Sequence, residues 1–193
     1  MVVVPTVLAL GLAGCGAGGD PPNAPPETAA GATTTGTTPS AAPTAATVAP
    51  TPSATKAAVP PTLAFSATTV DGKPFNAGSV AGKPVVLWFW AAWCPRCRAA
   101  APNVAALQRD FDGKVTVLGV AGLKSGADSM RQFVSDVGIG GFTNLADDEG
   151  VIWRKFGVTT QEYFVLIDAS GAVVHKGTLS GQALKDRVSA MAG

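Results

Sequence analysis

The chain has 193 residues, of which 47% are hydrophobic, and a formal net charge of +1. Positive and negative residues are nearly balanced, and Lys and Arg form no cluster that would indicate nucleic-acid binding. Charged residues are concentrated after about position 61, so the composition excludes a single globule of the full length and predicts one folded domain of ordinary size.

Residues 1–13 are apolar but too few to span a bilayer as a helix, which predicts the apolar part of an export signal. The signal ends in Leu12-Ala13-Gly14-Cys15, which resembles the bacterial lipobox, where cleavage before the cysteine accompanies acylation of its thiol. We therefore expect residues 1–15 to be a lipoprotein signal peptide, with Cys15 lipidated and the protein anchored on the extracytoplasmic side of the cell membrane. The alternative is a plain secretory signal with an incidental Cys15, which would give a secreted protein.

Residues 16–61 are rich in Pro, Thr, Ala and Gly and contain only three charged residues, Asp20, Glu27 and Lys56. A segment of this composition cannot bury a core, so it predicts a disordered linker. Residues 62–193 then form the folded domain, which the linker would tether to the membrane.

The folded domain begins with a predicted strand, Leu63 to Thr69, and a turn, Asp71 to Phe75, which together indicate a β-hairpin. The run Val85 to Trp90 has no polar face, as expected of a central strand covered by helices on both sides. The remaining pattern predicts a helix from Pro95 to about Phe111, a strand over 115–120, a helix opened by the capping-box-like Ser125-Gly126-Ala127-Asp128, a short helix over 151–156, strands over 163–167 and 172–176, and a final helix from about Gln182. This order predicts an α/β fold with a mixed central sheet flanked by helices and an N-terminal β-hairpin extension.

The sequence Trp93-Cys94-Pro95-Arg96-Cys97 follows the central strand and opens the first long helix. Two thiols separated by two residues form a ready dithiol/disulfide couple. The N–H groups and the positive dipole end of a helix stabilise a thiolate, and Arg96 acts in the same direction. Cys94 is therefore the expected nucleophile and Cys97, one helical turn further on, the expected resolving thiol.

A zinc site is the competing interpretation of paired cysteines, but a structural zinc site needs about four N or S ligands. The chain offers one further cysteine, Cys15, and one histidine, His175, both far from the pair in sequence. The acidic run Asp147-Asp148-Glu149-Gly150 lacks the alternating spacing of a calcium loop and is expected to be a solvated turn. We therefore expect neither a metal nor an external cofactor.

The stretch from Gly82 to Arg98, with Pro102 after it, resembles the active-site region of the thioredoxin-like TlpA/DsbE family. The similarity continues through segments 142–145, 150–153 and 165–168, and it is strongest toward the exported DsbE- and DsbF-like lipoproteins of actinobacteria. It implies a thioredoxin-like fold and oxidation, reduction or reshuffling of disulfides in exported proteins. The implied partners are exported cysteine-containing substrates and a membrane or extracytoplasmic redox protein.

The chain departs from this family at two positions. Trp88 stands where thioredoxins carry a buried Asp that handles the proton of the resolving cysteine, which disfavours a reductase of the cytosolic type. Glu162 stands where the family places a cis-proline opposite the dithiol. We expect Glu162 to face the dithiol and to weaken oxidising activity, and we expect Trp93, beside the nucleophile, to contact substrates.

The residues predict a thiol-disulfide oxidoreductase that acts as an oxidant or isomerase. Arg96, the helix dipole and an oxidising compartment favour that direction. One alternative is a reductant that serves cytochrome c maturation. The other is a redox-weak binding module for unfolded exported chains, in which Glu162 marks the loss of the catalytic surface.

Overall fold

The structure is a computed structural model that describes residues 58–193. The predicted signal peptide with Cys15, and nearly all of the predicted linker, lie outside the described residues. The strands are β1 (Ser66–Thr69), β2 (Pro74–Asn76), β3 (Val85–Trp90), β4 (Thr116–Ala121), β5 (Thr143–Ala146), β6 (Tyr163–Ile167) and β7 (Val173–Gly177). The helices are α1 (Pro95–Asp110), α2 (Ala127–Asp136), α3 (Val151–Phe156) and α4 (Gly181–Ala192), with 3-10 turns η1 (Pro61–Leu63) and η2 (Ala77–Val80).

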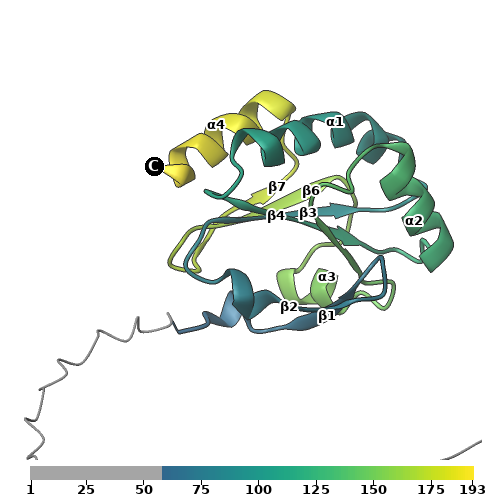
Figure 1. Ribbon diagram of the computed structural model, residues 1–193, viewed down its shortest axis with the longest axis horizontal. Coiled ribbons are helices and arrows are strands. Elements are labelled where there is room, and N and C mark those ends of the chain that lie inside the picture. The colour runs from purple at the N-terminus through teal and green to yellow at the C-terminus, as the bar shows by residue number, and fades with distance from the viewer. Residues whose placement is uncertain (1–57) are drawn as a thin grey trace, which may run out of the picture. The chain divides into compact units, whose positions relative to one another are not determined.

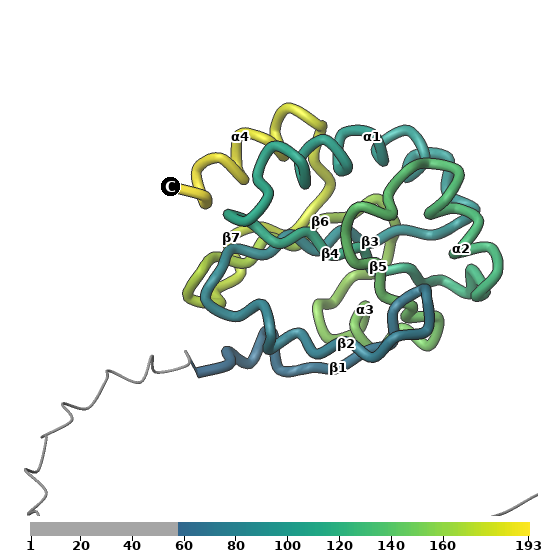
Figure 2. Tube along the Cα trace, viewed as in Figure 1, coloured from purple at the N-terminus to yellow at the C-terminus, as the bar shows by residue number. Residues whose placement is uncertain are grey.

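The strands form one sheet in the order β2-β1-β5-β4-β3-β6-β7. β3 runs parallel to β4, and β4 runs parallel to β5, because the crossovers pass through α1 and α2. β3 pairs with β6 in the antiparallel sense, so the predicted mixed sheet is confirmed. The tube in Figure 2 follows the crossover from β3 through α1 to β4, on the same side of the sheet as α4.

Helices cover both faces of the sheet. Figure 1 shows α1 and α4 on one face of the sheet and α3 on the other. Every residue of β3 is buried, and successive side chains point into opposite cores. Val86, Trp88 and Trp90 belong to the core that contains residues of α1, α2 and α4, and Val85, Leu87 and Phe89 belong to the core that contains residues of α3. Full burial of each such side chain contributes about 1.5–3 kcal/mol, so β3 anchors the segment that follows it.

The N-terminal hairpin is present, but its first strand begins later than predicted. Leu63 ends the 3-10 turn η1, which begins at Pro61, and β1 starts at Ser66. Pro60 and Pro61 fix φ and lack an N–H group for sheet pairing, which favours a turn there. β1 pairs with both β2 and β5, so the hairpin extends the main sheet at its edge.

Two predictions about the loops that precede α2 and α3 are wrong. The N-cap of α2 is Gly126, which has no side chain to accept a hydrogen bond, so no capping box forms. Asp147 is not in a solvated turn, because only 6% of it is exposed. Its carboxylate accepts hydrogen bonds from the first three N–H groups of α3, at distances of 2.7–2.9 Å.

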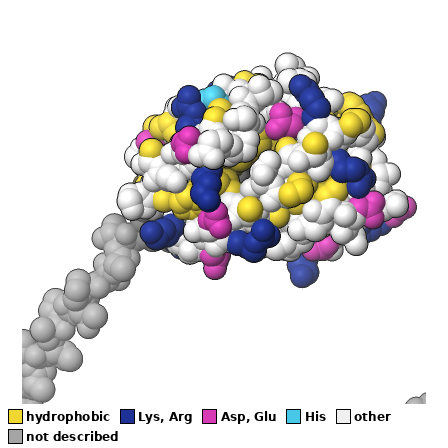
Figure 3. All heavy atoms as spheres, turned by 90° about the horizontal axis from the view of Figure 1, so that it is seen from above, with side chains coloured by type: hydrophobic (Ala, Val, Ile, Leu, Met, Phe, Trp, Pro, Cys, Tyr) yellow, Lys and Arg dark blue, Asp and Glu magenta, His cyan; other side chains and the backbone are white. Residues whose placement is uncertain are grey.

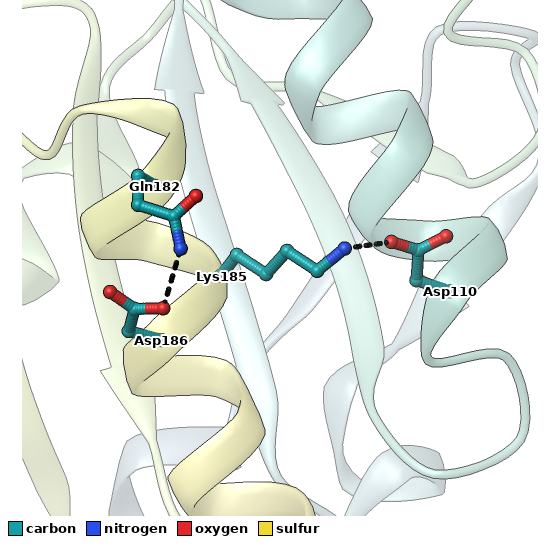
Figure 4. Close-up of polar contacts among 4 residues, drawn as sticks. All are labelled: Asp110, Gln182, Lys185 and Asp186. Carbon is teal, nitrogen blue, oxygen red and sulfur yellow. Dashed lines mark hydrogen bonds and ion pairs between the residues drawn. The ribbon is translucent and has the colours of Figure 1, made fainter.

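α1 and α4 pack side by side and are joined at their surface by charge. Lys185 on α4 lies 2.7 Å from Asp110 at the end of α1, and Gln182 donates to Asp186 one turn further along α4 (Figure 4). The Lys185 ammonium lowers the pKa of Asp110. On the face seen in Figure 3, basic and acidic side chains are interspersed among apolar ones. Among residues 58–193, no helix has both the length and the apolar character needed to cross a bilayer.

Candidate functional site

The two cysteines of the predicted site lie where β3 gives way to α1. Cys94 is the N-cap of α1, Pro95 is its first residue, and Cys97 lies in its first turn. The two residues form a disulfide with their Cα atoms 5.3 Å apart. Cys94 is 2% exposed and Cys97 is fully buried, so Cys94 is the sulfur nearer to solvent.

The backbone at the start of α1 is arranged to stabilise negative charge on Cys94. The Cys97 N–H donates to Cys94 Sγ over 3.0 Å, and the Arg98 N–H donates to the Cys94 carbonyl oxygen over 3.1 Å. Proline at the first helical position costs no hydrogen bond, because the N–H it lacks would have no partner within the helix. When the disulfide is reduced, the positive end of the helix and this N–H favour the thiolate of Cys94 over its thiol.

The two arginines of the site point in different directions. Arg96 is exposed and its Nη2 lies 3.5 Å from the Gln161 carbonyl oxygen, in the loop before β6. Arg98 instead turns toward α2, where its guanidinium carbon lies 5.2 Å from the Phe133 ring centroid and Nη2 lies 3.7 Å from Asp136. Arg96 is therefore the cation that links the dithiol segment to the loop of Gln161 and Glu162.

Glu162 has a left-handed backbone, with a φ of +55°. A left-handed conformation costs a residue with a side chain about 1–3 kcal/mol, so the surrounding loop must hold it. Burial raises the pKa of the Glu162 carboxyl, and the nearby Arg96 charge opposes that rise. The Arg96 charge therefore acts on Glu162 from the dithiol segment, and the orientation of Glu162 toward the dithiol itself stays a prediction.

Trp93 is 56% exposed, the most exposed aromatic side chain among the large hydrophobic residues of the described chain. Its indole N–H donates to the Leu123 carbonyl oxygen over 3.2 Å, which fixes the ring against the loop between β4 and α2. Leu123 and Lys124 of that loop both have left-handed backbones, each with a φ of 56°. Beside Trp93 a cleft of about 260 Å³ opens toward Ser129 and Asp136 on α2.

Trp88, at the family's buried Asp position, is fully buried in the same core as both cysteines. Its indole nitrogen has no hydrogen-bond partner among the described residues. An indole N–H cannot accept a proton, so Trp88 cannot perform the proton transfer that the carboxylate performs in thioredoxins.

Ser125 and Asp148 are the residues near the site that sequence reasoning missed. Ser125 was assigned to a capping box and Asp148 to a solvated turn, but Ser125 Oγ accepts a hydrogen bond from the Ala92 N–H, two residues before Cys94. No sequence signal predicts this role, because the fold alone brings the Ser125 hydroxyl to the Ala92 N–H, 33 residues away in the chain.

The site contains no metal-binding arrangement in the described residues. No group of three or more His, Cys, Asp or Glu side chains within residues 58–193 lies close enough to hold a metal ion. The redox-capable groups of the site are Cys94 and Cys97, with Arg96 and the start of α1 as the adjacent positive groups.

The chain is similar to proteins of known family. A model of the AhpC/TSA family matches residues 58–176. The soluble secreted antigen MPT53 of Mycobacterium tuberculosis (strain H37Rv) is 41% identical over 133 residues, covering 67% of this chain and 75% of that protein. Thiol:disulfide interchange protein DsbE of Yersinia pestis is 28% identical over 137 residues, covering 66% of this chain and 69% of that protein.

Solved structures agree in sequence and fold. MTB DsbF, in mixed oxidised and reduced forms, is 43% identical and superimposes with a TM-score of 0.65, covering 69% of this chain and 99% of that one. A secreted Mycobacterium tuberculosis disulfide oxidoreductase homologous to E. coli DsbE is 39% identical, with a TM-score of 0.61, and covers 67% of this chain and 97% of that one.

Proposed function

This chain belongs to the AhpC/TSA family and has a thioredoxin-like fold, and on that premise we propose that it is an exported thiol-disulfide oxidoreductase that oxidises or isomerises cysteines of exported proteins. The single observation that carries the proposal is the Cys94–Cys97 pair at the start of α1, with the Cys97 N–H directed at Cys94 Sγ. Relatives described as a disulfide oxidoreductase and as thiol:disulfide interchange proteins support it.

In the oxidising direction, a substrate thiolate attacks Cys94 Sγ. An S–S bond forms between substrate and Cys94, and the Cys94–Cys97 bond breaks, leaving Cys97 as the departing thiolate. A second substrate thiolate then attacks the substrate sulfur of this mixed disulfide, and Cys94 leaves as a thiolate. The substrate dithiol is oxidised by two electrons and the protein disulfide is reduced. Isomerisation begins with the reverse of the second step: the Cys94 thiolate attacks a substrate disulfide, and one substrate sulfur leaves as a thiolate.

The proposed oxidising direction follows from the groups that stabilise the reduced, thiolate form of Cys94. A thiolate at Cys94 is a better leaving group when the Cys97 N–H, the helix start and the Arg96 charge hold it, and a stabilised reduced form makes the disulfide more oxidising. The position of Glu162 near Arg96 favours the rival function, that of a reductant for cytochrome c maturation. Its carboxylate offsets Arg96 and moves the couple in the reducing direction.

The deciding measurement is the reduction potential of the Cys94/Cys97 couple, obtained by equilibration with glutathione buffers. CxxC proteins span roughly −270 to −120 mV, and we expect a value in the upper half of that range. A value near the lower limit would instead assign the reductant function. Failure to oxidise a reduced model protein or to reduce insulin would leave the redox-weak binding module for unfolded exported chains.

The proposed location is extracytoplasmic, with the protein anchored through lipid on Cys15. The apolar residues 1–13 and the lipobox-like Leu12 to Cys15 support export and lipidation, and the secreted mycobacterial relatives support export. The proposed partners are exported cysteine-containing proteins and a membrane or extracytoplasmic redox protein that restores the Cys94–Cys97 disulfide. If Cys15 is not lipidated, the protein is secreted.

A further inference from the structure

Ser125 is a buried serine that bridges two loops beside the dithiol. It is 9% exposed. Its Oγ accepts a hydrogen bond from the Ala92 N–H at 2.9 Å and donates one to the Gly122 carbonyl oxygen at 2.7 Å. One hydroxyl therefore ties the loop before α2 to the segment that leads into Cys94.

Asp148 holds Ser125 in place. Its two carboxylate oxygens accept hydrogen bonds from the N–H groups of Ser125, at 2.9 Å, and Gly126, at 2.8 Å. Its neighbour Asp147 is itself fixed, because the Asp147 N–H donates to Ala121 at the end of β4 over 2.7 Å. A bidentate carboxylate on two consecutive N–H groups leaves the serine backbone little freedom to move.

The tied segment shapes the first turn of the dithiol. Ala92 lies inside a turn that the Cys94 N–H closes on the Ala91 carbonyl oxygen over 3.1 Å. This turn sets the direction of the Cys94 side chain, whose Sγ must lie 3.0 Å from the Cys97 N–H to receive its hydrogen bond. Without the Ser125 hydroxyl, the Ala92 N–H would lose its acceptor and the turn would lose its anchor.

We propose that Ser125, held by Asp148, is a positioning residue for the reaction of Cys94: it fixes the Ala91–Cys94 turn so that the N–H groups at the start of α1 stabilise the Cys94 thiolate. The inference rests on the proposed thiol-disulfide exchange and names a residue pair that acts on it. The charged groups on the elements around this turn are Arg96 and Arg98 of α1, Lys124 of the loop before α2, Asp148 itself, and Glu162 of the loop before β6. Of these, only Asp148 is hydrogen-bonded to Ser125, so the contributions of the others remain when Ser125 is changed.

The test is the pH dependence of iodoacetamide labelling of Cys94 in the reduced full-length protein, read from the Cys94 peptide by mass spectrometry. Ser125→Ala should raise the Cys94 pKa and slow labelling in mildly acidic buffer about three- to tenfold, because the thiolate loses aligned N–H donors. Ser125→Thr keeps the hydroxyl and should label at a rate nearer to that of the wild type. Ser129→Ala is the matched control. Ser129 is exposed and lines the cleft beside Trp93, as Ser125 does, but it takes part in none of the hydrogen bonds that join Ser125 to Ala92, Gly122 and Asp148.

Asp148→Asn provides the second arm, in case Ser125→Ala does not fold. Removal of a negative charge alone would lower the pKa of a nearby thiol, whereas loss of positioning raises it, so the sign separates the two effects. A Cys94 pKa that rises in Asp148→Asn supports the proposal. A pKa that is unchanged or lowered in Asp148→Asn, or a Ser125→Ala protein that labels like Ser129→Ala, overturns it. The labelling needs no substrate, so it judges Ser125 even if the wild type fails to exchange disulfides, a result that would instead overturn the proposed function.

Discussion

At the scale of the residue, the two sulfurs differ in exposure and in their hydrogen bonds. Cys94 accepts the Cys97 N–H and is slightly exposed, while Cys97 is fully buried one turn further on. An incoming sulfur therefore reaches Cys94 first, and Cys97 is placed to complete or reverse the exchange from inside.

Cys97→Ala should accumulate mixed disulfides through Cys94, whereas Cys94→Ala should accumulate few. In the reduced wild type at mildly acidic pH, Cys94 should be alkylated about tenfold faster than Cys97, because its thiolate is the stabilised and accessible one. Peptide mapping can measure this directly, since trypsin cleaves after Arg96 and separates the two cysteines. Faster labelling of Cys97 would reverse the assigned roles.

Glu162→Gln should lower the Cys94 pKa through charge alone. A carboxylate beside Arg96 offsets the cation that favours the Cys94 thiolate, and an amide does not. The effect is measured by the same pH-dependent alkylation, with Glu149→Gln as an exposed control of equal charge change. An identical Cys94 pKa in all three proteins would mean that Glu162 does not act on the dithiol.

Glu162 should also make the free energy of unfolding depend on pH. Burial raises the pKa of Glu162 in the folded state above the ordinary value of 4.5. Between 4.5 and this raised pKa, the native state therefore binds more protons than the unfolded state. Stability is therefore lost as the pH rises from 4.5 through the raised pKa. Denaturant unfolding of wild type and Glu162→Gln from pH 4.5 upward should show a larger loss in the wild type, because Asp147, whose pKa is also raised, titrates in both proteins. Parallel profiles would contradict this expectation.

Proline at position 162 is not a simple restoration of the family pattern. Proline fixes φ near −65°, whereas Glu162 has a φ of +55°. The family resemblance predicts that Glu162→Pro would rebuild a cis-proline turn and lower the Cys94 pKa. The backbone indicates that the whole loop from Gln161 would have to change first, which is why Glu162→Gln is the cleaner variant.

At the scale of the element, α3 depends on a residue that precedes it. The buried Asp147 carboxylate satisfies the N–H groups of Val151, Ile152 and Trp153, which have no partner inside the helix. Burial raises the pKa of Asp147 even though these three donors lower it. α3 in turn places Trp153 and Phe156 against Phe89 of β3, at ring-centroid distances of 5.3 and 6.1 Å.

Asp147→Ala should therefore destabilise the fold by about 2 kcal/mol, the combined effect of losing a helix cap and leaving buried N–H groups unpaired. The midpoint of urea unfolding should fall while its slope stays constant. Glu149→Ala, an exposed change in the same turn, should alter stability by no more than about 0.5 kcal/mol. Equal midpoints for the two variants would show that the cap contributes nothing.

At the scale of the whole molecule, the predicted lipid anchor and linker would confine the redox domain to the neighbourhood of the membrane. Cys15 lies outside the described residues, so this remains a prediction from Leu12 to Cys15 and from the composition of residues 16–61. A single acyl chain gives only marginal membrane binding, so stable attachment would require more than one.

Cys15→Ser should move the exported protein from the membrane fraction to the soluble fraction without changing the reduction potential of the Cys94/Cys97 couple. Membrane fractionation of cells that express each form measures this, with Cys97→Ala as a control that should stay on the membrane. Equal solubility of wild type and Cys15→Ser after export would show that Cys15 carries no anchor.

The mixed α/β sheet, the buried strand Val85–Trp90 and the dithiol after that strand could all be predicted from the amino-acid sequence. Local patterns suffice for these features, because hydrophobic periodicity and motif spacing are properties of neighbouring residues. The family resemblance read from Gly82 to Arg98 is likewise confirmed by the comparisons.

The distant groups that surround the dithiol could be identified only in the folded protein. Ser125 and Asp148 are 23 residues apart in the chain, yet Asp148 accepts a hydrogen bond from the Ser125 N–H. Ser125 Oγ in turn accepts one from the Ala92 N–H, in the segment before Cys94. Asp147 is buried rather than solvated because the fold places the first N–H groups of α3 over its carboxylate. A sequence pattern reports whether a polar residue has local partners. It does not report the N–H groups of Ser125 and Gly126 that the crossover between β4 and β5 brings to Asp148, and those donors determine the role of that acid.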